Sequence, residues 1–333
     1  MGVPIAHVVL ISAAVGVWIA GNDGLILVQQ TVYGLDSYIL LAIPFFVVSG
    51  TIAAQGVTAQ RIINVINAFF GSIRGGLGIA TVFACAVFAS VSGSAIACVI
   101  AIGALMYPKL IEHGYPKPLA LGIIASAGTL GAMIPPSILM IVWGGILTVS
   151  IGGLFLAGIV PGMLITLVLM CTVYVYAKRR GYPVFERAAF REILCAGAHA
   201  VPALLTPLMI VSGKLFGWFT ATESGCIAVL YATVLSFVVY REMDAKGFWG
   251  ALLDTGRFAS VALFCVGTAS AFGWLLAYYQ IPQYMLAGVA SWGLGITGTG
   301  FMVAAVFLIV GCFLDAIPSI IIVGTILQPM TKA

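Results

Sequence analysis

Two clusters in the middle of the chain carry oxygen atoms that an ion or a small solute could bind. Ser90, Ser92 and Ser94 interrupt an apolar run, and a double proline follows at Pro135–Pro136. Proline lacks the backbone N–H and pushes the residue before it out of the helical region. Carbonyl oxygens beside Pro135–Pro136 therefore lose their helical partners. In secondary transporters, unwound backbone of this kind binds ions and substrate.

Asp315 is a third candidate, because it lies deep inside another apolar run. Its flanks, Gly311–Leu314 and Ala316–Ile317, offer no cationic partner. A bare carboxylate inside a membrane is costly, so either a bound cation or a proton must neutralise Asp315. The sequence is compatible with a sodium ligand and with a protonated structural group.

Other kinds of chemistry find no support in the residue pattern. His7, His113 and His199 show no metal-ligand spacing, and no nucleophile is paired with a base. We therefore expect no transition metal, no organic cofactor and no enzymatic activity. The net charge of +4 comes from Lys and Arg scattered over loop ends, which does not indicate nucleic-acid binding.

The composition places these candidates in a membrane protein. Of the 333 residues, 62% are hydrophobic and 7% are charged, with a mean hydropathy of +1.18. Soluble domains carry far more charge. The apolar runs are long enough for transmembrane helices rather than the strands of a β-barrel. The expected fold is an all-α polytopic membrane protein.

The run 77–108 predicts a re-entrant hairpin. It is longer than the ~20–25 residues that a tilted span needs. Arg74 precedes it and Lys109 follows it, and basic residues mark the cytoplasmic side. A hairpin with its tip at Ser92–Ser94 returns both ends to that side. The alternative is one long helix whose serines bond back to their own carbonyls.

The remaining runs predict spans on either side of basic, cytoplasmic loops, the clearest of which begins at Lys178–Arg180. The expected division has four parts. Residues 1–36 form an N-terminal scaffold helix and a periplasmic connector, and 181–222 form a cytoplasmic linker and a scaffold span.

The other two parts are repeats. The first repeat, 37–180, has a span, an interfacial arm, the hairpin 77–108, a broken helix 118–149 and a span 153–177. The second repeat, 223–333, is incomplete and has spans 224–240 and 258–279, an arm 281–292 and a hairpin 299–329.

A shift of 221 positions superposes the first hairpin on the second. Gly103 then meets Gly324, and Ser94 at the first tip meets Asp315. Both halves run in the order span, arm, hairpin, and on the charge-based topology the hairpins open to opposite sides. This predicts an inverted repeat, the architecture of alternating-access carriers, here an elevator-type transporter with two re-entrant hairpins and a broken helix.

At these residues the chain resembles the large membrane (M, DctM-like) subunit of tripartite ATP-independent periplasmic (TRAP) transporters. The motifs that carry the resemblance are Gly2–Ala6, Ile43–Phe46, Ser92–Ala95, Gly114–Tyr115, Gly128–Ser137, Thr222–Glu223 and Gly311–Asp315. The resemblance implies a sodium symporter for organic acids (C4-dicarboxylates, sialic acid or similar carboxylates) in the bacterial inner membrane. It implies two protein partners, a periplasmic binding protein that delivers substrate and a small Q (DctQ-like) membrane subunit.

The resemblance, together with the hairpin geometry, assigns roles to individual residues. The implied sodium ligands are Ser92, Ser94, Gly131, Ile134, Pro136 and Asp315. The implied substrate contacts are Ser92, Gly93, Thr129, Pro135 and Tyr278. Some of them have a plainer alternative: a serine can bond its own helix, Asp315 can be a protonated structural group, and Tyr278 can anchor a helix at the membrane interface.

The chain departs from the family pattern at both ends. The family carries a further N-terminal helix and a further C-terminal part, so we expect this chain to lack them. A truncated, non-transporting scaffold or assembly subunit therefore stays an alternative function. Another is a standalone sodium-coupled carrier of divalent anions, which would need no binding protein. The particular organic acid does not follow from the sequence.

Overall fold

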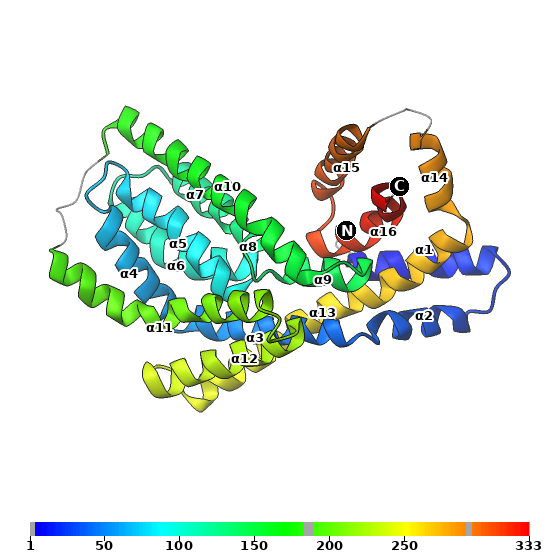
Figure 1. Ribbon diagram of the computed structural model, residues 1–333, viewed down its shortest axis with the longest axis horizontal. Helices are drawn as coiled ribbons and strands as arrows, with labels where there is room; N and C mark the ends of the chain where they lie inside the picture. The colour runs from blue at the N-terminus through cyan, green and yellow to red at the C-terminus, as the bar shows by residue number, and fades with distance from the viewer. Residues whose placement is uncertain (1–3, 183–188, 291–294, 333) are drawn as a thin grey trace. The chain divides into compact units, whose positions relative to one another are not determined.

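In the computed structural model, which describes residues 4–182, 189–290 and 295–332, these residues form helices and no β-strand. Figure 1 shows their course. In chain order they are α1 (Ile5–Ile19), α2 (Leu25–Leu35), the 3-10 turn η1 (Tyr38–Leu41), α3 (Ala42–Gln55), α4 (Thr58–Phe70), α5 (Gly76–Ser92), α6 (Ala95–Glu112), α7 (Lys117–Gly128), α8 (Leu130–Met133), α9 (Ile138–Leu147), α10 (Ile151–Arg180), α11 (Phe190–Leu215), α12 (Ala221–Val234), the π-helical segment η2 (Leu235–Val239), α13 (Ala245–Tyr278), α14 (Ile281–Ala290), α15 (Ile296–Gly311) and α16 (Ala316–Lys332).

Seven of the helical stretches among the described residues are long and apolar enough to cross a membrane. The longest is α13, and α10 has the highest hydropathy. Large hydrophobic side chains are exposed along α10, including Val160, Leu164 and Leu167. Helices with such outer faces are stable in lipid rather than in water. The prediction of an all-α polytopic membrane protein is confirmed.

The chain folds into two compact units. The larger unit comprises Leu41–Ile141 and Ser150–Gly256, and the smaller comprises Met1–Leu40, Val142–Val149 and Arg257–Ala333. The larger unit contains the first predicted hairpin and the broken helix as far as Ile141, whereas Val142–Val149 belongs to the smaller unit. The smaller unit contains Asp315 and Tyr278.

Helix α5 forms the centre of the larger unit, and α6 packs against it. Nearly every residue of α5 is buried, because α4, α7 and α10 all pack against it. Gly75 and Gly93 bound α5 in the left-handed conformation, with φ +74° and +64°. Only glycine adopts this conformation at low cost, so these two residues define where the helix begins and ends.

The far end of the hairpin is anchored by aromatic stacking. The Tyr115 ring, in the turn between α6 and α7, stacks on Tyr182 with 4.4 Å between centroids. The Gly78 N–H donates to the Tyr115 hydroxyl at 3.4 Å. Burial raises the pKa of Tyr115, so the phenol stays protonated. These contacts join the base of the hairpin to the end of α10.

Two segments are more helical than the sequence analysis expected. The connector 21–36 contains the helix α2, which begins where the Leu25 N–H donates to the Asp23 carboxylate at 3.0 Å. The linker and span expected within 181–222 form one continuous helix from 190 to 215. Residues 1–3, 183–188, 291–294 and 333 of the predicted parts lie outside the described residues.

In the smaller unit, α15 and α16 pack against each other as a second hairpin. Asp315 directly precedes α16, and its side chain is exposed. A cavity of about 510 Å³ elsewhere in this unit is lined by residues that include Tyr33, Asp36 and Ser270. None of the predicted site residues is among those that line it.

Candidate functional site

The first hairpin turns at Gly93, between the end of α5 and the start of α6. The Gly93 N–H donates to the Ala89 carbonyl, which closes α5. Ser94 then takes an extended conformation, and its hydroxyl accepts from the Ala97 N–H at 3.4 Å. The sequence thus builds the tip from a glycine that ends one helix and a serine that caps the next. One long helix, the alternative, is wrong.

The tip packs directly on the broken helix of the same unit. The Ile138 N–H donates to the Gly93 carbonyl at 3.0 Å, so the tip caps the N-terminus of α9. A Cβ on Gly93 would lie 2.8 Å from the Pro136 carbonyl oxygen, and one on Gly131 would lie 2.7 Å from the Ala95 nitrogen. Contacts this close between two backbones are possible only because both residues are glycines.

Ser92 and Ser90 differ in what their hydroxyls bind. The Ser90 hydroxyl donates to the Val87 carbonyl at 2.6 Å within its own helix. The Ser92 hydroxyl is fully buried, with 0% exposure, and has no hydrogen-bond partner among the described residues. An unpaired buried hydroxyl is unusual and requires an explanation. A bound cation would supply one.

The ends of three helices lie at the tip: α5 ends before Gly93, α6 begins after Ser94, and α9 begins at Ile138, whose N–H is bonded to the Gly93 carbonyl. A helix C-terminus carries partial negative charge, which favours a cation. A helix N-terminus carries partial positive charge, which favours an anion. The polarity of the tip is therefore compatible with both kinds of charge, without a formally charged side chain.

The other predicted residues of this unit surround the same tip less directly. Ile134 ends α8 in an extended conformation, and its N–H donates to the Leu130 carbonyl. Pro135 and Pro136 follow it as a cis pair. Thr129 is exposed, and its hydroxyl donates to the Ser126 carbonyl at 2.7 Å. The Thr129 hydroxyl is therefore bonded to a carbonyl of the preceding helix, α7.

The two remaining predicted residues belong to the smaller unit. Tyr278 ends α13, is half-exposed and stacks on Trp274 with 5.4 Å between centroids. Asp315 stands before α16 as Ser94 stands before α6. The two residues that the 221-residue shift superposes therefore hold the same position in their hairpins.

The sequence analysis missed the contribution of α3 to the tip. A Cβ on Gly50 would lie 2.7 Å from the Ser92 carbonyl oxygen. The neighbouring Ser49 is also fully buried, with a hydroxyl that has no partner among the described residues. The available signal was the small pair Ser49–Gly50 inside an otherwise apolar helix.

Comparison with known proteins decides the family. The sequence matches the family described as "Tripartite ATP-independent periplasmic transporter, DctM component" over residues 1–333. The chain belongs to the DctM family of TRAP transporter large permeases. The predicted resemblance is therefore confirmed, and the members of this family are permeases rather than enzymes.

Three relatives show the range of the family. The C4-dicarboxylate TRAP transporter large permease DctM of Pseudomonas aeruginosa is 38% identical, over 89% of this chain and 69% of its own length. The 2,3-diketo-L-gulonate permease YiaN of Escherichia coli is 37% identical, over 100% of this chain and 78% of its own length. The ectoine/5-hydroxyectoine permease UehC of Ruegeria pomeroyi is 35% identical, over 92% of this chain and 72% of its own length. These three relatives are named for different solutes, although their sequences are similar to this chain over most of its length.

Proposed function

We propose that this DctM-family chain is the membrane-embedded subunit of a sodium-coupled TRAP transporter that imports organic acids across the bacterial inner membrane. The observation that carries the proposal is the buried, unpaired hydroxyl of Ser92 at a tip where carbonyl-bearing helix ends meet. Sodium, as a hard cation, takes hydroxyl and carbonyl oxygens as ligands. The Ser94 hydroxyl and the carbonyls of Gly131, Ile134 and Pro136 would complete the set.

The N-termini of α6 and α9 would hold the carboxylate of the substrate beside this ion. Gly93 lies two residues before α6 and Pro135 three residues before α9, and Thr129 precedes α8; we assign all three to the substrate. The relatives named for a C4-dicarboxylate and for 2,3-diketo-L-gulonate support a carboxylate substrate. In the proposed cycle, sodium and substrate bind together because each lowers the electrostatic cost of the other.

The proposed partners follow from the family. A transporter described as tripartite needs two further components. We assign these to a periplasmic binding protein, which delivers the substrate, and to a small DctQ-like membrane subunit. The two hairpins, one in each unit, support the proposal that substrate crosses by an elevator movement between inverted repeats.

Substitution of Ser92 tests the sodium site. Ser92→Ala removes one ligand oxygen and little volume, so we expect sodium-dependent uptake to need about tenfold more sodium, the equivalent of ~1.4 kcal/mol. Ser90→Ala is the matched control, because the Ser90 hydroxyl already bonds to Val87. The assay is uptake of a radiolabelled C4-dicarboxylate into vesicles that contain the chain and both partners. The same sodium dependence in both variants would refute the assignment.

A further inference from the structure

The junction between α3 and α4 is capped by a carboxylate from a distant part of the chain. The Val57 N–H, just before α4, donates to Glu242 Oε2 at 2.9 Å. Helix N-termini leave backbone donors unsatisfied and carry partial positive charge. A side chain 185 positions away in the sequence therefore supplies the cap that α4 lacks locally.

The second oxygen of the same carboxylate has no donor. Glu242 Oε1 is buried and has no hydrogen-bond partner among the described residues. It lies against Gly56, where a Cβ would collide with it and would also lie 3.4 Å from the Ile52 carbonyl oxygen. The Ile52 carbonyl accepts from the Gly56 N–H at 3.2 Å, and a carbonyl oxygen can accept a second bond. A proton on Oε1 would turn this unpaired acceptor into a donor toward that carbonyl.

Charged and titratable groups from α4, α11 and the 240–244 loop surround this carboxylate. The Arg61 guanidinium lies 3.8 Å from the centre of the Tyr240 ring and donates to the His199 carbonyl at 3.5 Å. The Tyr240 hydroxyl donates to that carbonyl at 3.2 Å. The His199 ring bonds the Cys195 carbonyl instead.

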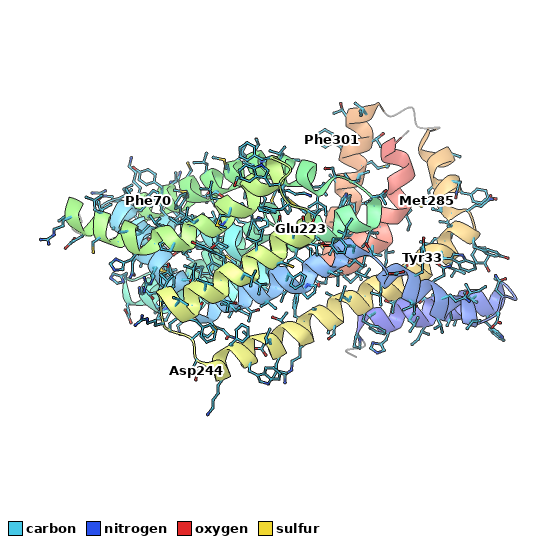
Figure 2. All side chains as sticks on the ribbon, turned by 60° about the horizontal axis from the view of Figure 1, so that its bottom comes forward. Tyr33, Phe70, Glu223, Asp244, Met285 and Phe301 are labelled. Atoms are coloured by element: carbon cyan, nitrogen blue, oxygen red, sulfur yellow. The ribbon has the colours of Figure 1, made fainter. Side chains whose placement is uncertain are left out.

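The two charged residues that flank Glu242 on its own loop are Arg241 and Asp244. The Asp244 carboxylate accepts from the Gly247 N–H at 2.7 Å and so caps α13 locally. Figure 2 labels Asp244 at this turn. Burial raises the pKa of Glu242, although the Val57 N–H and the Arg61 charge both act to lower it.

We propose that Glu242 binds a proton at Oε1, and that this proton tightens the junction between α3 and α4. In the ionised form, only Oε2 is satisfied. In the protonated form, Oε2 still accepts from Val57, and the new O–H donates toward the carbonyl beside Gly56. The proton comes from the solvent and returns to it, because the Glu242 side chain is only partly buried.

This junction positions the first hairpin, because α4 packs extensively on α5. The consequence for transport rests on the function proposed above. A firm α4 keeps the base of α5 in place while substrate binds at the tip. Glu242 is then a positioning residue that affects the rate of transport and not the affinity for sodium or substrate.

The sign of the pH effect follows from the direction of the pKa shift. The folded protein holds this proton more firmly than the unfolded chain, so the stabilising contribution is complete below the ordinary pKa of glutamate. It is lost as the pH rises through the raised pKa. Acidification toward the ordinary pKa of glutamate should therefore tighten the junction between α3 and α4, and alkaline conditions should loosen it.

Glu242→Gln, Glu242→Ala and a matched control test the proposal. Glutamine keeps an acceptor for Val57 and imitates the protonated acid, whereas alanine removes the cap. Glu192→Gln is the control, because the Glu192 carboxylate also caps a helix, at the Ala189 N–H, but is exposed. All variants are purified as the full chain in detergent.

The first measurement needs no transport. Infrared spectra recorded in a pH series that rises from the ordinary pKa of glutamate should show a protonated carboxylic acid band in the wild type and in Glu192→Gln, and this band should decrease as the pH rises. The band should be weaker in Glu242→Gln than in the wild type, by the absorbance of one carboxylic acid. An equally strong band in Glu242→Gln and in the wild type would overturn the proposal.

The second measurement is uptake by the chain with its partners. We expect Glu242→Ala to lower the maximal rate about fivefold, the size expected for the loss of one helix cap. The concentrations of sodium and of substrate that give half-maximal uptake should stay unchanged. Glu242→Gln should keep the rate and lose its dependence on pH. A pH profile identical to wild type in Glu242→Gln would also overturn the proposal. If the wild type takes up nothing, the proposed function fails, and the infrared experiment still decides the proton site.

Discussion

Gly93→Ala is the most direct test of how the hairpin tip and the broken helix support each other. Gly93 has φ +64°, and the left-handed conformation costs alanine about 1 kcal/mol. The added Cβ would also lie 2.8 Å from the Pro136 carbonyl oxygen, closer than such atoms approach. The tip must then move away from Pro136, which weakens the bond from the Ile138 N–H and costs about 1 kcal/mol more.

Gly114→Ala separates these two costs. Gly114 has φ +81°, and a Cβ there would meet nothing within 4 Å. We therefore expect a loss of about 1 kcal/mol for Gly114→Ala, from backbone conformation alone. For Gly93→Ala we expect about 2 kcal/mol, because the bond from the Ile138 N–H is weakened as well. The difference between the two variants measures the packing of the tip.

The assay is thermal unfolding of the purified chain in sodium chloride and in choline chloride. A ligand that binds only the folded state raises its stability in proportion to RT ln(1 + [L]/Kd). Wild type and Gly114→Ala should both be stabilised by sodium, and Gly93→Ala should lose most of that response. Equal stability losses in both variants, with an unchanged sodium response, would refute the close packing described here.

Two further substitutions extend the test to other parts of the site. Gly131→Ala should destabilise the chain by about 2 kcal/mol, because its Cβ would lie 2.7 Å from the Ala95 nitrogen. Gly122→Ala is the control: a Cβ there would meet nothing within 4 Å, so it should cost no more than a few tenths of a kcal/mol. Equal unfolding temperatures for this pair would contradict the close approach. Asp315→Asn should leave the stability within about 0.5 kcal/mol, because asparagine caps a helix as well as aspartate, yet it should abolish sodium-coupled uptake by the chain with its partners. Normal uptake by that variant would show that Asp315 is a structural group.

The sequence predicts the helices and their breaks well, because each break has a local chemical cause. Gly93 ends α5, Ser94 starts α6, and Pro135–Pro136 separates α8 from α9. These residues act through their own backbone, so their effect is visible in the sequence without knowledge of neighbours. The order span, arm, hairpin follows from the same signals.

Contacts between distant segments could not be predicted in this way. The approach of Gly50 to Ser92 and the cap that Glu242 gives to Val57 depend on how helices pack. Glycine in an apolar helix indicates a close neighbour but does not identify it. Likewise, the acidic residue at 242 looks like an ordinary loop carboxylate until α4 is seen to begin against it.

The two hairpins show which part of a site the sequence determines. Ser94 and Asp315 hold the same position before α6 and α16, which the internal repeat predicts. A cap residue alone provides one oxygen, and a cation in an apolar environment needs several. Within the larger unit, the further oxygens come from Ser92 and from the broken helix that packs on the tip at Gly131 and Pro136. The proposed sodium site would therefore depend on two backbones held together by glycines. In that proposal the serines supply oxygens, and the close approach allowed by Gly93 and Gly131 decides whether those oxygens can share one ion.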